Sequence, residues 1–278
     1  FGPERVIDTP LAESAIVGVA IGMAMNGLRP VAEIQFMGFS YLTLSQIICH
    51  ASRMRNRTRG RLTVPMVVRM PYGAGVKALE HHSESTEALY AQIPGLKVVV
   101  PATPSEAKGL LISSIRDPDP IIFLEPTRNY RLMKEEVREG EYTIPIGKAR
   151  IVQEGSDITV IGWGGMMPLI QDAVKKAQSD KISVEVIDLR TLSPMDSAAI
   201  VGSVKKTGRA VIVHEAPKTA GLGAEIVARI NEKALLSLEA PVERVTAPDI
   251  TVPLPMGENF YYPSVDKILA GIRKVTAF

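Results

Sequence analysis

One carboxylate in this chain stands where it could do chemistry. Glu13 follows a short proline-containing stretch and precedes a run of small apolar residues over positions 14–27. The run predicts a helix buried on most sides, with Pro10 in its first turn and Thr9 as its N-cap. A carboxylate at the head of such a helix requires a partner. From spacing alone, Glu13 is either a functional acid or a partner of the helix N-terminus, and the second is commoner.

A histidine pair is the second candidate. His81 and His82 follow Gly73 and Gly75, which indicate a tight loop after a predicted strand. Open α/β sheets bind ligands at the carboxyl ends of their strands. Because histidine titrates near neutrality, the pair suits proton transfer or binding of an anionic intermediate. The alternative that both are solvated, or that one caps the next helix, is about equally favoured by the sequence.

Several familiar sites are not predicted. The His-His segment lacks the ligand spacing of a zinc site, and no cysteine joins it. There is no Walker loop and no convincing Gly-x-Gly-x-x-Gly behind a strand. The glycines at 162–165 and 221–223 are better interpreted as tight turns. Cys49 lies in an apolar helical run and is expected to be a buried structural thiol.

The elements that must position these residues alternate between strand and helix. We expect α/β architecture, with two doubly wound, mostly parallel-sheet domains. Apolar runs bounded by turns predict strands at 29–36, 65–70, 96–100, 121–125, 158–163, 183–189 and 210–214. Helical patterns lie at 42–55, 82–92, 103–116, 167–179, 223–236 and 265–275, and Ser193–Asp196 is expected to cap another helix.

Charges crowd into residues 134–141, where the apolar periodicity is lost. We therefore place a first domain at 1–130, a linker at 131–145 and a second domain at 146–278. The chain opens at Phe1 without a methionine and enters a strand-like segment at once. We expect an N-terminal segment to precede it.

Composition narrows the class of protein. The 278 residues are 46% hydrophobic and 22% charged, with a net charge of +2, which predicts neither nucleic-acid nor membrane binding. A single cysteine fits a reducing compartment. Without a visible targeting segment we expect a cytoplasmic protein, or a mitochondrial-matrix protein in a eukaryote.

Longer motifs in the sequence favour the interpretation of Glu13 as a functional acid. The chain contains Asp-Thr-Pro-Leu-Ala-Glu at 8–13, Gly-Leu-Arg-Pro-Val-Ala-Glu-Ile-Gln-Phe at 27–36 and Glu-His-His-Ser at 80–83. Further long matches lie at 94–110 and 187–196. Together they resemble the beta subunit of the decarboxylating, thiamine-diphosphate-dependent component of 2-oxo acid dehydrogenase complexes. Pyruvate and branched-chain members share these motifs, and the resemblance spans the whole chain.

The resemblance implies roles for individual residues. Glu13 would bind the N1′ nitrogen of the cofactor's aminopyrimidine, and His82 would face the reacting centre. Phe39 would stack on the aminopyrimidine, although most phenylalanines after a strand are core residues. Leu11 and Gln35 would line the same pocket.

A missing motif implies a partner. The chain lacks the Gly-Asp-Gly motif, followed by Asn, that holds magnesium and diphosphate in thiamine enzymes. A second chain must then supply that half of the site, as the alpha subunit does in the family's α2β2 tetramer. The resemblance further implies a transketolase-type C-terminal domain, used for assembly and for docking the lipoyl-bearing dihydrolipoyl acyltransferase core.

Residues 114–119 resemble the structural potassium loop of the family. The resemblance implies that carbonyls at Met66, Ser114 and Asp117, with Asp119, hold the ion. Some relatives carry asparagine at the position of Asp119. A plain Asp-Pro turn after a helix explains the segment equally well.

The function implied is decarboxylation of a 2-oxo acid, followed by reductive acylation of the acyltransferase's lipoyl group. Two alternatives stay open. One is another thiamine-diphosphate enzyme, such as the beta subunit of acetoin dehydrogenase. The other is a non-catalytic α/β scaffold that only docks partners.

Overall fold

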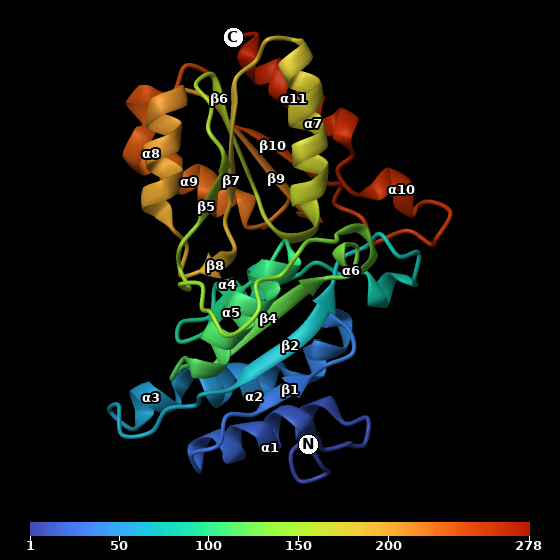
Figure 1. Ribbon diagram of the computed structural model, residues 1–278, viewed down its shortest axis with the longest axis vertical. Helices are drawn as coiled ribbons and strands as arrows, with labels where there is room; N and C mark the ends of the chain where they lie inside the picture. The colour runs from blue at the N-terminus through green and yellow to red at the C-terminus, as the bar shows by residue number, and fades with distance from the viewer.

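The computed structural model describes residues 1–278 and contains two α/β domains that follow one another along the long axis of the molecule (Figure 1). The sheet of the N-terminal domain has the order β1-β2-β4-β3-β8. Its first four strands are parallel, and β8 pairs antiparallel with β3. The strands are β1 (Val31–Glu33), β2 (Val67–Tyr72), β3 (Lys97–Val99), β4 (Ile121–Pro126) and β8 (Thr191–Ser193).

The sheet of the C-terminal domain has the order β10-β9-β6-β7-β5. Only β5 runs antiparallel to its neighbour. The strands are β5 (Arg150–Gln153), β6 (Ile158–Gly162), β7 (Val184–Asp188), β9 (Ala210–Pro217) and β10 (Glu243–Ala247). The predicted fold class is confirmed. The two edge strands β5 and β8, and β10, have no counterpart among the predicted strands, because short or half-exposed edges lack a continuous apolar run.

Strand β8 ties the domains together. It comes from the second half of the chain but closes the first sheet, with Val98 opposite Ser193. Next to it, the Val100 N–H donates to the Arg190 carbonyl at 2.8 Å. The largest buried cluster runs from α1 through both sheets to residues such as Ile200 and Ile226. The N-terminal sheet is therefore completed by the domain that follows it.

Helices of the N-terminal domain differ from the predicted ones near the candidate site. The expected helix at 42–55 is broken into three short pieces, and the one expected at 82–92 becomes helical only at Glu87. The helical segments are α1 (Glu13–Met25), η1 (Met37–Thr43), α2 (Leu44–Cys49), η2 (Ala51–Arg53), α3 (Met54–Arg57), η3 (Glu80–His82), α4 (Glu87–Ala91), α5 (Pro104–Arg116) and α6 (Asn129–Leu132). Here η denotes a 3₁₀ segment, and such tight turns connect elements where a regular helix does not continue.

Helices of the C-terminal domain lie on both faces of its sheet, α7 and α11 on one and α8 and α9 on the other (Figure 1). Two of them, α8 and α11, begin at sequence-readable caps: the Asp196 and Ser264 side chains accept the N–H groups of Ala199 and Lys267. The helical segments are η4 (Gly164–Met166), α7 (Met167–Ser179), α8 (Ser197–Thr207), α9 (Gly223–Ala234), η5 (Leu235–Ser237), α10 (Glu258–Tyr261) and α11 (Val265–Thr276).

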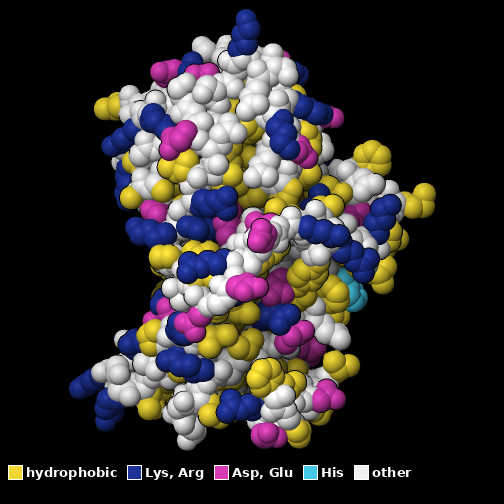
Figure 2. Space-filling model, in the orientation of Figure 1, with side chains coloured by type: hydrophobic (Ala, Val, Ile, Leu, Met, Phe, Trp, Pro, Cys, Tyr) yellow, Lys and Arg dark blue, Asp and Glu magenta, His cyan; other side chains and the backbone are white.

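The surface carries both signs of charge. On the face drawn in Figure 2, Lys and Arg side chains are interspersed with Asp and Glu side chains over both domains. No helix combines the length and the apolar character needed to cross a bilayer. No three His, Cys, Asp or Glu side chains converge in a way that would hold a metal ion.

Candidate active site

Helix α1 begins at Glu13, not at the proline. Thr9 and Pro10 are exposed and lie outside the helix, and Ala12 occupies the N-cap position with no side-chain cap. The prediction of a Thr9 cap was therefore wrong. Glu13 is half-buried, and its carboxylate has no hydrogen-bond or ion-pair partner within the chain. The positive end of the helix dipole is its only fixed electrostatic support.

The helix is also less buried than expected. Val17, Ala20, Ile21 and Ala24 face the core, whereas Val19 on the opposite side is 62% exposed. An apolar helix with one side in solvent exposes surface that water disfavours. The sequence predicted burial on most sides, and the chain by itself buries only one of them.

An aromatic group stands next to the head of α1. Segment η1 packs against α1, and the Ser14 hydroxyl, adjacent to Glu13, donates to the Leu42 carbonyl in η1. Phe39 on η1 meets the His81 ring edge-on, with centroids 4.9 Å apart, and the His82 ring at 5.3 Å. Two segments distant in sequence, 36–42 and 80–82, are thus brought together, and the first of them packs against α1.

His82 is held by phenylalanines and has a nitrogen without a partner. Its ring packs edge-on against Phe36 at 4.7 Å as well as against Phe39. Its Nδ1 is buried and makes no hydrogen bond. A buried polar nitrogen without a partner is uncommon and indicates a ligand or a functional role. The alternative that both histidines are freely solvated does not describe His82.

His81 faces a different environment. Its Nδ1 lies 3.9 Å from the Glu84 carboxylate, an attraction that operates when the imidazole is protonated. Tyr41 donates its hydroxyl hydrogen to the same carboxylate. Burial raises the pKa of Glu84 above its usual value. His81 is therefore tied to its own loop, while His82 keeps a nitrogen free.

Leu11 and Gln35 lie on the open side of this group. Leu11 is 83% exposed, and Gln35 is also exposed. The chain therefore presents a carboxylate, an aromatic ring and an imidazole on a surface, and not within an enclosed cavity. These are suitable groups for a flat heterocycle with a ring nitrogen. No cluster of carboxylates or glycine-rich phosphate loop accompanies them.

Two buried glutamates near the histidine loop were not predicted as site residues. Glu87, at the start of α4, is fully buried without a hydrogen-bond partner, and this burial raises its pKa to about 8. Burial likewise raises the pKa of Glu215, in β9, to about 7, although Arg128 opposes the shift. The only signal in the sequence is the pair His214-Glu215 at the end of the predicted strand at 210–214, which is too weak to predict a site.

The residues suggested as potassium ligands lie at the other end of the sheet, where the two aspartates form salt bridges with a lysine and an arginine. The Lys97 ammonium lies 2.6 Å from Asp117 Oδ1 and 3.4 Å from Asp119 Oδ2. Arg55 Nε is 2.6 Å from the second carboxylate oxygen of Asp119. Both aspartate side chains therefore have cationic partners.

The backbone oxygens there have donors too. The Met66 carbonyl accepts the Ile121 N–H at 2.9 Å, and the Ser114 carbonyl accepts the Asp117 N–H at 3.3 Å. Each carbonyl retains a second lone pair. Only backbone oxygens could contribute to a cation site in this arrangement.

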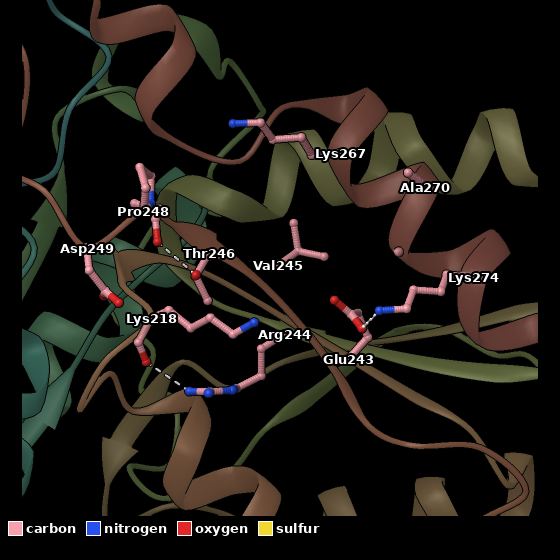
Figure 3. Close-up of a pocket in the computed structure, with 12 residues that line it drawn as sticks. Lys218, Glu243, Arg244, Val245, Thr246, Pro248, Asp249, Lys267, Ala270 and Lys274 are labelled. Carbon is pink, nitrogen blue, oxygen red and sulfur yellow. Dashed lines mark hydrogen bonds and ion pairs between the residues drawn. The ribbon is translucent and has the colours of Figure 1, made fainter.

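A further surface cavity lies in the C-terminal domain. It has a volume of about 520 Å³ and is formed by β10, α11 and the segments at 218 and 246–249 (Figure 3). Some of the charged side chains that line it pair with each other: the Lys274 ammonium lies 2.7 Å from the Glu243 carboxylate. None of the predicted site residues lines it.

Comparison with known proteins identifies the family to which the chain belongs. Residues 1–133 match the family model of the transketolase pyrimidine-binding domain, and residues 147–268 match that of the transketolase C-terminal domain. A chain from Acholeplasma laidlawii named pyruvate dehydrogenase E1 component subunit beta is 55% identical over 275 residues, covering 99% of this chain and 84% of that one. The chain belongs to the beta-subunit family of the thiamine-diphosphate-dependent 2-oxo acid dehydrogenases.

Other relatives agree with this family. The pyruvate dehydrogenase E1 component subunit beta of Bacillus subtilis (strain 168) is 51% identical over 278 residues, covering all of this chain and 86% of the relative. A solved structure described as a split gene transketolase, inactive beta4 tetramer, superposes with a TM-score of 0.81 at 22% identity and covers 99% of this chain and 85% of that chain. At that identity, the structure supports the fold alone. The family resemblance in the sequence motifs is confirmed.

Proposed function

We propose that this chain is the beta subunit of a pyruvate dehydrogenase-type E1 component, which decarboxylates a 2-oxo acid and passes the acyl group to a lipoyl arm. The observation that carries the proposal is the unpartnered Glu13 carboxylate at the head of α1, a helix that packs against the segment carrying Phe39, which in turn contacts His82. Pyruvate is the first substrate to test, because the most similar relatives reported above bear that name.

Each residue has a defined task in this proposal. Glu13 holds a proton at the ring nitrogen of an aminopyrimidine, where a carboxylate without an internal partner can accept or return it. Phe39 packs on the flat ring, and Leu11 and Gln35 cover its edge. His82 lies where its free nitrogen can stabilise the substrate carboxylate or move a proton during acyl transfer. Thiamine diphosphate, when bound, supplies the electron sink for loss of carbon dioxide.

The site is proposed to be completed by an alpha subunit. This chain provides groups for the pyrimidine half of the cofactor, and it brings together no three His, Cys, Asp or Glu side chains that could hold a metal ion. Apolar side chains around the head of α1 lie in solvent, among them Leu11, Val19 and Leu42. Burying them against a second chain would enclose the cofactor and remove apolar surface from water. A magnesium ion would be held by that chain.

A lipoyl-bearing acyltransferase core is the proposed second partner, and an α2β2 assembly the proposed stoichiometry. Both rest on the family to which the chain belongs. Cytoplasmic localisation belongs to the same proposal, since the relatives named above are bacterial chains.

We also keep a potassium ion among the proposed ligands, held by the backbone oxygens of Met66, Ser114 and Asp117. Salt bridges to Lys97 and Arg55 leave Asp117 and Asp119 no free carboxylate for the ion. Unfolding of the chain in potassium chloride and in sodium chloride of equal concentration tests the site. A higher Tm in potassium supports it, and identical values remove potassium from the proposal.

The deciding experiment measures decarboxylation with an artificial electron acceptor, thiamine diphosphate and magnesium, using this chain with and without its alpha partner. Activity only with both chains supports the split site. A panel of pyruvate, branched-chain 2-oxo acids and acetoin then identifies the substrate. If a well-folded two-chain complex turned over none of these compounds, the scaffold alternative would replace the enzyme.

A further inference from the structure

The loop that leads from β2 to the histidine pair is bonded to carboxylates of the other domain. The Glu215 side chain on β9 accepts the backbone N–H of Ala74. Glu258 Oε1, on α10, accepts the N–H of Gly75 at 2.5 Å and that of Lys77 at 3.3 Å. Three backbone donors of this loop, at 74, 75 and 77, are thus used by two side chains of the C-terminal domain. In Figure 1, α10 lies beside the loop that follows β2.

The contact is buried and closely fitted. Glu258 has no exposed surface, and Glu215 has 5%. Gly73 and Gly75 have φ values of +87° and +111°, which side-chain-bearing residues rarely adopt. A β-carbon on Gly73 would come within 2.9 Å of the Glu215 carboxylate, and one on Gly75 within 2.9 Å of Arg128 Nε. Loop and carboxylates approach each other more closely than a side chain would allow.

A cation acts on one of the two carboxylates, that of Glu215. The Arg128 guanidinium stacks over the Tyr262 ring at 3.9 Å, and its charge opposes the raised pKa of Glu215. Tyr262 follows α10, so the same short segment supplies both Glu258 and the surface on which Arg128 rests. Hydrogen bonds from backbone N–H groups to a buried carboxylate are among the stronger ones in proteins. The arrangement is therefore suited to fixing backbone position.

The base of the loop is fixed on its own domain. The Gly73 N–H donates to the Glu84 carbonyl at 2.9 Å, and the Thr127 hydroxyl donates to the Gly73 carbonyl at 2.8 Å. Beyond this base, the two glutamates accept the backbone N–H groups of three of the four residues at 74–77, and so anchor the loop that leads to His82. A catalytic group misplaced by about 1 Å can lose on the order of 100-fold in rate.

We propose that Glu258 and Glu215 are positioning residues, through which the C-terminal domain holds the 73–77 loop and thereby places His82 in the active site. The inference rests on the proposed function, in which His82 acts in acyl transfer to the lipoyl group. It gives the C-terminal domain a part in the chemistry as well as in assembly.

The test uses the complete alpha–beta complex and two activities. One is decarboxylation of pyruvate with an artificial acceptor, and the other is reductive acylation of a free lipoyl domain. Glu258→Ala removes the acceptor for Gly75 and Lys77, and we expect a 10- to 100-fold lower kcat for acylation. The artificial-acceptor rate at saturating pyruvate should change by less than about threefold, because Glu13 and Phe39 are untouched.

Two further variants separate positioning from folding. Glu258→Gln keeps an accepting oxygen and should restore most of the acylation rate, whereas Glu258→Asp shortens the reach and should give an intermediate loss. If Glu258→Ala does not fold, the Gln and Asp variants decide. Asp157→Ala is the matched control, because it also removes a carboxylate that accepts a backbone N–H, that of Ser183 at 2.8 Å, but far from the loop.

Amide hydrogen exchange provides a readout that does not need activity. Exchange at Gly75 and Lys77 should be at least about tenfold faster in Glu258→Ala than in wild type, and unchanged in Asp157→Ala. Unchanged exchange would overturn the anchoring, and faster exchange with normal acylation would overturn the positioning role. An inactive wild-type complex would instead contradict the proposed function, while exchange would still decide the anchoring.

Discussion

Gly38 and His81 lie in direct contact. A β-carbon on Gly38 would overlap the His81 carbonyl oxygen and come within 3.0 Å of its ring nitrogen Nδ1. Segments η1 and η3 are therefore locked together at a point that has no room for a side chain. This contact fixes the relative positions of Phe39, one residue along η1, and His82, one residue along η3.

The variant Gly38→Ala tests that lock. The added methyl forces the backbone of η1 or of the histidine segment to shift, and overpacking of this kind costs about 1–3 kcal/mol. We expect lower activity together with a lower free energy of unfolding. Gly202→Ala is the control, because a β-carbon there meets nothing and alanine favours α8 by up to about 1 kcal/mol. Equal activity in both variants would show that the histidines tolerate the shift.

Replacing Glu13 by glutamine tests the proposed acid. The side chain keeps its size but loses the ability to exchange a proton, so kcat should fall by about 10²–10⁴-fold. The free energy of unfolding should change by less than about 0.5 kcal/mol, since the carboxylate has no partner in the chain. Glu136→Gln, at an exposed position in the linker, should leave activity unchanged. Normal turnover of the Glu13 variant would remove this residue from the mechanism.

The sequence predicted more of the fold than of the site. Helices α5 and α7 begin and end where the sequence placed them, because a Thr103 cap and a strong apolar period specify them locally. The aromatic–imidazole contacts depend on segments 42 residues apart, Phe39 and His81, and on a 3₁₀ turn without any periodicity. Only the family resemblance brought those residues together in advance.

Glu215 illustrates why the remainder could not be predicted. Its donor, Ala74, is 141 residues away in sequence and contributes only a backbone N–H, which leaves no pattern to detect. Strand β8 was missed for a related reason, since its three residues pair across the domain boundary. Interactions that backbone atoms make over long sequence separations can be recognised only when the fold is known.

Glu87 should make stability depend on pH. Its pKa is about 8 in the folded chain and about 4.5 when unfolded, so the folded state binds the proton more tightly. The free energy of unfolding should therefore fall as the pH rises from about 4.5 to about 8, by about 1.4 kcal/mol per pKa unit of difference. Glu87→Gln cannot ionise, and its stability should exceed that of wild type increasingly toward pH 8.

Urea unfolding at pH 5, 6, 7 and 8 measures this difference. Glu232→Gln, on the exposed side of α9, is the control and should follow wild type at every pH. Glu215, whose burial raises its pKa to about 7, contributes to the same pH range and remains in both variants. A gap between Glu87→Gln and wild type that does not widen with pH would mean that Glu87 ionises freely in the folded chain.

The exposed side of α1 should be where the alpha subunit binds. Val19 is 62% exposed on an apolar helix whose opposite side is core, so Val19→Glu adds a charge without disturbing packing within the chain. A charge buried at an interface without a partner is strongly unfavourable. We expect Val19→Glu to fold like wild type but to lose assembly with the alpha chain, and with it thiamine-dependent activity.

Leu236→Glu, at a fully exposed leucine on η5, introduces the same charge on the other domain and should leave alpha–beta assembly intact. Size-exclusion chromatography of each variant mixed with the alpha chain measures the outcome. Should Val19→Glu elute with its partner as wild type does, the contact surface would have to lie elsewhere than on this side of α1.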